Sequence, residues 1–459
     1  MRSYDLAIIG SGPGGYVTGI YAARHGLITC LIEKDLVGGT CLNKGCIPTK
    51  SLLNSVSIIS KLKHAPDFGI TIDAYRVDFE KVMSRKDEVV SRLRAGVESL
   101  LKANKIELIK GEARLASADT IAIDGREEIK AKNIIIATGS SVAHLPNINI
   151  DNDNVLSSES ILNIKRVPRS LVIIGGGVIG CEFASLFANL ASKVTIVEMT
   201  DRLIPGQSRE ASKKLEYNFK RSGIDVLTSS MVESLSAAGS VTVRVSGGKI
   251  IEAEKALVSI GRVSNIKGLA LEGVGIKTYN DKICVNEFLA TDIPNIYAVG
   301  DCVPGPQLAH KASYDGILAC DNILGKSRKV DYSNIPNCIW TEPEIASVGL
   351  PEEAAKVMHQ DIKVAKFTYL ASGKAYLEGE TEGFVKIVGV PSTGEIIGVE
   401  IFGKDACNLI GEATLAKTRG VKIEDWGRVV HGHPTLSEIF QESCYVFLSP
   451  LIPAGRNPE

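Results

Sequence analysis

Two cysteines lie close together in the stretch GGTCLNKGCIPTK, which spans residues 38–50. Cys41 and Cys46 are five positions apart, whereas the other eight of the ten cysteines are scattered singly. A pair at this spacing could be part of a metal site, a structural disulfide, or a catalytic pair that cycles between dithiol and disulfide. Each alternative makes a different demand on the surrounding residues.

The surroundings favour the catalytic pair. A zinc or iron–sulfur site needs further thiolates or histidines at short spacing. The next cysteine along the chain is Cys181, and the nearest histidines are His25 and His64. A structural disulfide is rare in a reducing compartment. We therefore predict a working redox pair and no metal.

The spacing of the pair also predicts a distorted backbone. In an ideal helix, residues five apart have Cα atoms roughly 8–9 Å apart, and a disulfide spans at most about 7 Å. Gly45 can relax the backbone between the two thiols. A following helix favours a thiolate at its N-terminus, and Lys50 shares a helix face with Cys46. Lys44, between the thiols, is predicted to lower the pKa of one of them.

Thiol exchange also needs a group that takes up the thiol proton. Among seven histidines, His433 in HGHPTLSE stands out. Pro434 fixes the turn after it, and Glu438 can return to the imidazole ring and fix its tautomer. The alternative is an ordinary surface His–Glu pair. Because the same chain carries a candidate redox pair, we favour the general base.

A strand–glycine–helix–strand–acid pattern occurs twice. Each copy has glycines at GxGxxG spacing, and a glutamate follows 18 residues after the last glycine. The glycines allow a tight turn, close approach to a pyrophosphate and helix–strand packing, and the acid can bind a ribose. The first copy consists of Gly10, Gly12, Gly15 and Glu33, and the second of Gly175, Gly177, Gly180 and Glu198. The chain is therefore expected to bind two dinucleotides.

The charge at the end of the second copy indicates which nucleotide binds there. A carboxylate holds a ribose 2′-OH but repels a 2′-phosphate. Arg202 is close in sequence and keeps NADP as an alternative, but Glu198 favours NAD. The first copy, which carries the cysteine pair, would then hold a flavin.

Composition narrows the class of protein. A chain of 459 residues that is 44% hydrophobic is expected to form about three domains. The net charge of −1 shows no excess of positive charge of the kind that binds nucleic acid. No apolar run reaches the roughly 18 residues of a membrane span, and the N-terminus enters a strand pattern without a signal peptide. We expect a cytoplasmic protein.

The pattern of elements is typical of an α/β protein with two Rossmann-like units. Short strands over 133–140 and 256–262 are predicted to close the two units, and a long amphipathic helix over 78–105 lies between them. Another buried strand ends at Gly300-Asp301 and precedes a helix. Beyond about Asp331, strands over 383–389 and 394–403, then helices from Ala406, indicate an α+β domain.

These motifs resemble those of the pyridine nucleotide–disulfide oxidoreductases. The most specific are GGTCLNKGCIPTK and HGHPTLSE, and GGGVIGCE, IYAVGD, LAHKA and TEPEIASVG follow the family's order over nearly the whole chain. The resemblance implies a homodimer with FAD and NAD. Cys46 would face the flavin as a thiolate and Cys41 would exchange with substrate. His433, oriented by Glu438, would act on Cys41 of the partner subunit.

The resemblance also implies the cofactor contacts. The FAD site would be formed by Gly10, Gly12, Gly14, Gly15, Glu33, Lys50, Thr138, Gly139, Asp301 and Ala309. The NAD site would be formed by Gly175, Gly177, Gly180, Glu182, Glu198 and Gly261, with Glu182 also paired to Lys50. The chain departs from the commoner family pattern at Lys44, Thr49, Trp340, Lys374 and Gly432. These departures remove no reacting group.

The resemblance further implies domains and activity. The expected domains are residues 1–142 for FAD, 143–264 for NAD, 265–332 as a central domain completing the FAD site, and 333–459 as the interface domain. The implied reaction is reoxidation of dihydrolipoyl groups by NAD⁺. The implied partners are the lipoyl and subunit-binding domains of a 2-oxo acid dehydrogenase acyltransferase and the lipoyl carrier of glycine cleavage. The alternatives are a related NAD(P)H-dependent disulfide or mercuric reductase and a non-catalytic flavin-binding scaffold.

Overall fold

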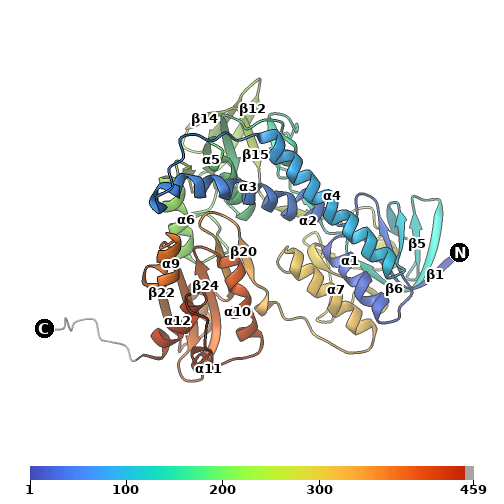
Figure 1. The fold of residues 1–459 in the computed structure, drawn as a ribbon. Helices are drawn as coiled ribbons and strands as arrows, with labels where there is room; N and C mark the ends of the chain where they lie inside the picture. The colour runs from blue at the N-terminus through green and yellow to red at the C-terminus, as the bar shows by residue number, and fades with distance from the viewer. Residues whose placement is uncertain (450–459) are drawn as a thin grey trace.

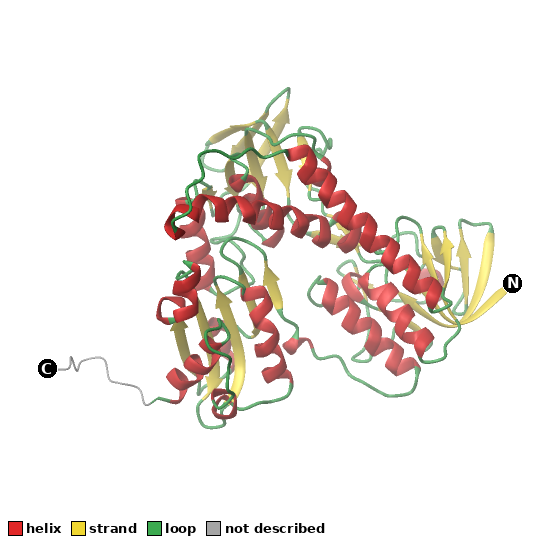
Figure 2. Cartoon of the chain, viewed as in Figure 1, coloured by secondary structure: helices red, strands yellow, loops and turns green. Residues whose placement is uncertain are grey.

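The chain folds into three lobes in the computed structural model, which describes residues 1–449; residues 450–459 of the predicted interface domain lie outside that range. Figure 1 shows the N-terminal lobe at the right, a second lobe with β12 and β15 at the top, and the C-terminal lobe at the lower left. Figure 2 shows that helices cover sheets in the first and last lobes, while strands dominate the top of the second.

The first lobe is built on a seven-stranded sheet in the order β3-β2-β1-β6-β5-β4, with β19 also paired to β6. Strand β1 is buried on both faces, because Leu6 and Ile8 join one hydrophobic cluster and Ala7 and Ile9 another. The strands are β1 (Arg2–Ile9), β2 (Thr29–Glu33), β3 (Glu107–Lys110), β4 (Ala113–Leu115), β5 (Thr120–Ile123), β6 (Glu127–Ile136) and β19 (Ile296–Ala298). The helices are α1 (Pro13–Arg24), α2 (Gly39–Lys44), α3 (Cys46–His64), α4 (Phe79–Ala103) and α7 (Ala309–Ile323).

The second lobe repeats the parallel arrangement in a five-stranded sheet, β11-β10-β9-β15-β8. A three-stranded antiparallel sheet, β12-β13-β14, lies beyond it. The strands are β8 (Val155–Ser157), β9 (Ser170–Ile174), β10 (Lys193–Val197), β11 (Asp225–Leu227), β12 (Val232–Ala237), β13 (Val241–Val245), β14 (Ile250–Ala253) and β15 (Lys255–Val258). The helices are α5 (Val178–Asn189) and α6 (Arg209–Arg221). The two strands predicted to close the units both end earlier than expected: β6 ends at Ile136 and β15 at Val258.

The residues after these two strands form a connection between the lobes. Strands β7 (Ser140–Val142) and β16 (Arg262–Ser264) pair with each other in an antiparallel ribbon. The sequence pattern did not reveal this break, because the apolar runs continue to Gly139 and Gly261, where φ is +69° and +122°. A second small ribbon joins β17 (Thr278–Tyr279) and β18 (Lys282–Ile283).

The C-terminal lobe is an antiparallel sheet, β20-β21-β24-β23-β22, with helices packed against it. Its core includes Trp426, Tyr369 and Phe440. The strands are β20 (Asn337–Ile339), β21 (Ile345–Gly349), β22 (Lys363–Thr368), β23 (Phe384–Val390) and β24 (Glu395–Phe402). The helices are α8 (Glu352–Met358), α9 (Gly373–Glu378), α10 (Ala406–Thr418), α11 (Ile423–Gly427) and α12 (Glu438–Leu448).

Two features are absent from residues 1–449. None of the helices there combines the length and the apolar composition needed to cross a bilayer. The same residues hold no group of three or more His, Cys, Asp or Glu side chains placed to bind a metal ion.

Candidate active site

A cavity of 1440 Å³ brings together both glycine fingerprints, the cysteine pair and strand β20. Of the predicted site residues, those lining it are Gly10, Gly12, Gly14, Glu33, Cys41, Cys46, Lys50, Thr138, Gly139, Gly175, Gly177, Glu182, Glu198, Gly261, Asp301 and Ala309. Four predicted residues are not in its lining: Gly15, Gly180, His433 and Glu438. The first two of these four lie behind the wall, and the last two belong to the C-terminal lobe.

The fingerprint glycines adopt the same geometry in both copies. Gly10 and Gly175 have φ of +104° and +107°, which favours glycine. A Cβ added at either position would lie 2.4 or 2.5 Å from a backbone oxygen. At Gly15 and Gly180 an added Cβ would lie 1.9 and 2.0 Å from the oxygens of Gly10 and Gly175. The third glycine of each copy therefore lets the helix pack closely against the end of the strand.

The acid of the first copy, Glu33, is buried at the end of β2. Its Oε2 accepts hydrogen bonds from Ser11 N at 2.9 Å and Ser11 Oγ at 2.7 Å, and its Oε1 accepts one from Asp35 N at 2.7 Å. These bonds fix the carboxylate beside the glycine turn, where it also lines the cavity.

The acid of the second copy, Glu198, is held in the same way. Gly176 N donates to its Oε2 at 2.5 Å, and the backbone N and Oγ1 of Thr200 donate to its Oε1 at 2.7 and 2.8 Å. Arg202, the residue that kept NADP in consideration, instead donates to Pro205 O at 2.9 Å. Arg202 is not part of the cavity lining.

The helix carrying the cysteine pair is broken between the two thiols, as the spacing predicted. Helix α2 ends at Lys44 and α3 begins at Cys46, with Gly45 between them at φ −144° and ψ −109°. Cys41 is half-buried and Cys46 is exposed to the cavity. Both are free thiols. Cys46 therefore lies at the N-terminus of a 19-residue helix.

The environment separates the two thiols into one that ionises readily and one that does not. A hydrogen bond from Cys41, aided by the positive charge of Lys50, lowers the pKa of Cys46 to about 7. The same hydrogen bond, together with burial, raises the pKa of Cys41 above that of an ordinary thiol. Cys46 is thus the thiol able to carry negative charge near neutral pH.

Lys50 is the cation that acts on this pair, and Lys44 is not. Lys50 Nζ forms an ion pair with Glu182 at 2.6 and 2.8 Å, and Trp340 N donates to the same carboxylate at 3.0 Å. Lys44 Nζ pairs with Asp35 instead. The prediction that Lys44 lowers a thiol pKa was wrong. Lys44 is adjacent to the thiols in sequence, but its side chain extends to Asp35, and the charge that acts on both thiols is that of Lys50.

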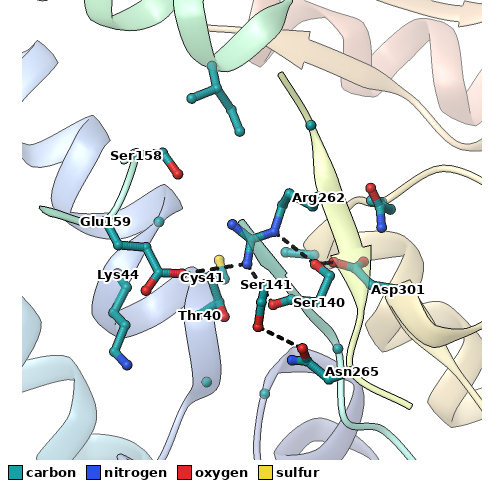
Figure 3. Close-up of a pocket in the computed structure, with 18 of the residues that line it drawn as sticks. Thr40, Cys41, Lys44, Ser140, Ser141, Ser158, Glu159, Arg262, Asn265 and Asp301 are labelled. Carbon is teal, nitrogen blue, oxygen red and sulfur yellow. Dashed lines mark hydrogen bonds and ion pairs between the residues drawn. The ribbon is translucent and has the colours of Figure 1, made fainter. Parts of the chain in front are cut away.

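A polar cluster that the sequence analysis missed lines the same cavity as Cys41 (Figure 3). Ser140 Oγ donates to Asp301 Oδ2 at 2.5 Å, and Arg262 Nε donates to Ser140 Oγ at 2.8 Å. Arg262 also lies 3.7 Å from Glu159. Of these residues the sequence indicated only Asp301, and the adjacent Gly261 was the one signal for Arg262.

His433 and Glu438 form the predicted pair in the C-terminal lobe. His433 Nδ1 lies 2.9 Å from Glu438 Oε1, and Thr435 N donates to Glu438 Oε2 at 2.8 Å. The Thr435 amide and the nearby imidazole lower the pKa of Glu438. The His433 side chain is 81% exposed. The ring is therefore oriented by Glu438 and lies outside the lining of its own chain's cavity.

The cavity has features that fit nucleotide cofactors. Gly39 has φ +62°, and a Cβ there would lie 2.6 Å from Gly12 Cα, so the two loops approach each other as bare backbone. Asn337 Oδ1 is buried in the wall and has no hydrogen-bond partner within residues 1–449. Bare backbone at a helix N-terminus suits a pyrophosphate. An unpaired amide oxygen can accept a hydrogen bond from the polar edge of a cofactor ring.

Comparison with known families identifies this architecture. The pyridine nucleotide-disulphide oxidoreductase model matches residues 4–316, and the dimerisation domain model of the same family matches residues 335–444. The chain belongs to the pyridine nucleotide–disulphide oxidoreductases. The family binds FAD and a pyridine nucleotide, and its chains pair through the C-terminal domain.

Individual relatives are similar over almost their whole length. The chain is 41% identical to a dihydrolipoyl dehydrogenase of Bacillus subtilis, covering 95% of this chain and 97% of that protein. It is 39% identical to the mitochondrial dihydrolipoyl dehydrogenase of Pisum sativum, covering 96% and 90%. The crystal structure of LpdA from Mycobacterium tuberculosis superimposes with a TM-score of 0.91 at 26% identity, covering 97% and 99%.

Proposed function

We propose that this protein is a dihydrolipoyl dehydrogenase, which oxidises protein-bound dihydrolipoyl groups with NAD⁺. The observation that carries the proposal is the Cys41–Cys46 pair, which opens on the same cavity as both fingerprints and has one thiol with a pKa of about 7. Similarity to dihydrolipoyl dehydrogenases over 95% of the chain supports the substrate class.

The first step requires a base for the substrate thiol. His433 Nε2 accepts the proton, while Nδ1 stays bonded to Glu438, which stabilises the resulting cation. Because the ring is outside its own chain's cavity, we assign it to the thiol pair of the partner in a homodimer. The dimerisation domain match supports this arrangement.

The exchange then uses the separated properties of the two thiols. The substrate thiolate attacks Cys41 Sγ of the disulfide, and Cys46 leaves as the thiolate that Lys50 stabilises. The second substrate thiol attacks the sulfur bound to Cys41, which releases the oxidised substrate and a Cys41 thiol. A flavin bound in this cavity supplies a two-electron carrier between the reduced thiols and NAD⁺.

The second fingerprint favours NAD over NADP. Glu198 presents a carboxylate where the ribose is expected, and Arg202 donates its hydrogen bond to Pro205 O.

We assign residues 1–142 to FAD binding, 143–264 to NAD binding, 265–332 to completing the flavin site and 333–459 to dimerisation. We expect lipoyl and subunit-binding domains of 2-oxo acid dehydrogenase complexes, and the glycine cleavage carrier, as partners. A cytoplasmic location stays a prediction.

An assay with dihydrolipoamide tests the proposal. We expect turnover with NAD⁺ to exceed turnover with NADP⁺ by at least about tenfold. Turnover with NADPH and a small disulfide, without dihydrolipoamide oxidation, would instead identify a related disulfide reductase. A flavoprotein that catalyses neither dihydrolipoamide oxidation nor disulfide reduction would be a non-catalytic scaffold.

A further inference from the structure

A second pair of thiols lies in the C-terminal lobe, outside the proposed reaction. Cys338 is on β20 and Cys407 is on the first turn of α10, 69 positions further along the chain. Cys338 Sγ lies 3.9 Å from Cys407 O, and Cys407 Sγ lies 3.6 Å from the oxygen of Ile339, the neighbour of Cys338. Each thiol therefore reaches the backbone of the other's segment.

The two thiols differ in access and in ionisation. Cys338 lines the cofactor cavity together with Lys50 and Glu182, whereas Cys407 does not. A hydrogen bond from Cys407, with a contribution from the charge of Lys50, lowers the pKa of Cys338. That hydrogen bond, burial and the nearby Glu344 carboxylate raise the pKa of Cys407. This is the arrangement of an attacking thiol beside a resolving thiol.

We propose that Cys338 and Cys407 form a second oxidisable site, at which a peroxide oxidises Cys338 and Cys407 resolves the product as an intramolecular disulfide. The proposal is independent of the activity assigned above. Each sulfur already contacts the backbone of the other's segment, so rotation about the two Cα–Cβ bonds can bring the sulfurs to bonding distance.

The chemistry balances with hydrogen peroxide as the only co-reactant. The Cys338 thiolate attacks one peroxide oxygen, the O–O bond breaks, and the released hydroxide takes a proton to become water. Cys407 Sγ then attacks the sulfur of the Cys338 sulfenic acid, the S–O bond breaks, and the hydroxyl leaves with the Cys407 proton as a second water. Two thiols lose two electrons and one peroxide becomes two waters.

The position of the pair gives the bond a structural consequence. The disulfide would join β20 to α10 covalently. Trp340, two residues after Cys338, donates its backbone N–H to the Glu182 carboxylate that holds Lys50. The oxidised pair would thus fix the strand that supports the ion pair beside Cys46.

Peptide mapping of the peroxide-treated flavoprotein tests the proposal directly. After thiol blocking and tryptic digestion, Cys338 lies in the peptide 330–356 and Cys407 in 405–417, each with a single cysteine. The proposed bond gives a linked 330–356/405–417 species, distinct from the 35–44/45–50 species of the Cys41–Cys46 disulfide. Failure to find the 330–356/405–417 link, while peroxide oxidises other cysteines, would overturn the proposal.

Single substitutions test which cysteine attacks the peroxide and which one resolves the sulfenic acid. In Cys407→Ser, a cyclic diketone should label a sulfenic acid at Cys338, and in Cys338→Ser both the label and the link should disappear. Half-buried Cys284 is the matched control, since Cys284→Ser should form the 330–356/405–417 link as the parent does. If the cyclic diketone labelled Cys284 as strongly as Cys338 in Cys407→Ser, the oxidation would be ordinary surface oxidation, and this result would also overturn the proposal. Bound flavin, measured for each variant, verifies folding.

Discussion

Lys50 and Glu182 form an ion pair that joins the thiol-bearing helix of the first lobe to the fingerprint helix of the second. Lys50 is on α3 and Glu182 on α5, 132 positions apart, with Nζ–Oε distances of 2.6 and 2.8 Å. Glu182 is almost fully buried, and Trp340 of the C-terminal lobe also donates to it. All three lobes therefore contribute to the position of the cation beside Cys46.

Replacing Lys50 should make Cys46 a weaker acid. A cation favours the thiolate, so Lys50→Met should raise the pKa of Cys46 above its value of about 7. We expect alkylation of Cys46 in the reduced enzyme to slow by about fivefold at pH 7 and to recover at higher pH, where the thiolate forms without the cation. Rates of alkylation measured from pH 5 to 10, with peptide mapping of Cys46, provide the test.

Lys44 offers the matched control for Lys50. It also lies beside the thiols in sequence but pairs with Asp35. Lys44→Met should leave the pH profile of Cys46 alkylation unchanged. A shift in Lys44→Met as large as that in Lys50→Met would contradict our assignment of the cation.

Substitution of the two cysteines should have different spectroscopic effects. Cys41→Ser keeps the ionising thiol, so the flavoprotein should retain the long-wavelength absorbance typical of a thiolate beside a flavin, whereas Cys46→Ser should lose it. Both should lose dihydrolipoamide turnover, because no disulfide can form. Full turnover in Cys41→Ser would show that the exchange role is misassigned.

Much of the site could be predicted because its signals are local. The fingerprint glycines, Glu33 and Glu198 lie in single strand–turn–helix–strand units, so spacing alone indicates their geometry. The break at Gly45 followed from the reach of a disulfide compared with the rise of a helix.

Other parts required the tertiary structure. Ser140 meets Asp301 across 161 positions, and Cys338 meets Cys407 across 69, so no short motif contains either pair. Strand β19 joins the first sheet although nearly 160 residues separate it from β6. The error over Lys44 has the related cause that a long flexible side chain can turn to whichever carboxylate is nearest in space.

Glu198 and Glu33 occupy equivalent places and provide a controlled test of nucleotide choice. Glu198→Gln keeps the size of the side chain but removes the charge, so we expect the KM for NAD⁺ to rise about tenfold and the preference for NAD⁺ over NADP⁺ to narrow. Glu33→Gln should instead weaken flavin retention and leave the KM for NAD⁺ near its parent value. Steady-state kinetics with both nucleotides and flavin content measure the two effects. Equal effects of both variants on the KM for NAD⁺ would contradict two separate sites.

His433 is expected to act only on the thiol exchange. His433→Gln should reduce dihydrolipoamide oxidation by about a hundredfold, because the base is lost. Transfer from NADH to an artificial dye, which needs no thiol exchange, should change less than about twofold. The control is His64→Gln, since His64 pairs with Asp67 as another exposed histidine–carboxylate pair at 3.3 Å. If His433→Gln slowed the dye reaction as much as the dihydrolipoamide reaction, a structural role would replace that of a base.

Subunit mixing tests whether the base comes from the partner. As homodimers, His433→Gln chains should keep only about one hundredth of parental turnover and Cys41→Ser chains none. A dimer containing one of each has one complete site, because the chain with intact Cys41 faces the chain with intact His433. Random reassortment should therefore restore about one quarter of parental turnover, since half of the dimers are mixed and each has one working site of two. Differently tagged chains, co-expressed and purified as mixed dimers, should reach about half. Mixed dimers with no turnover would place His433 and Cys41 of one chain in the same site and would exclude the arrangement across the interface.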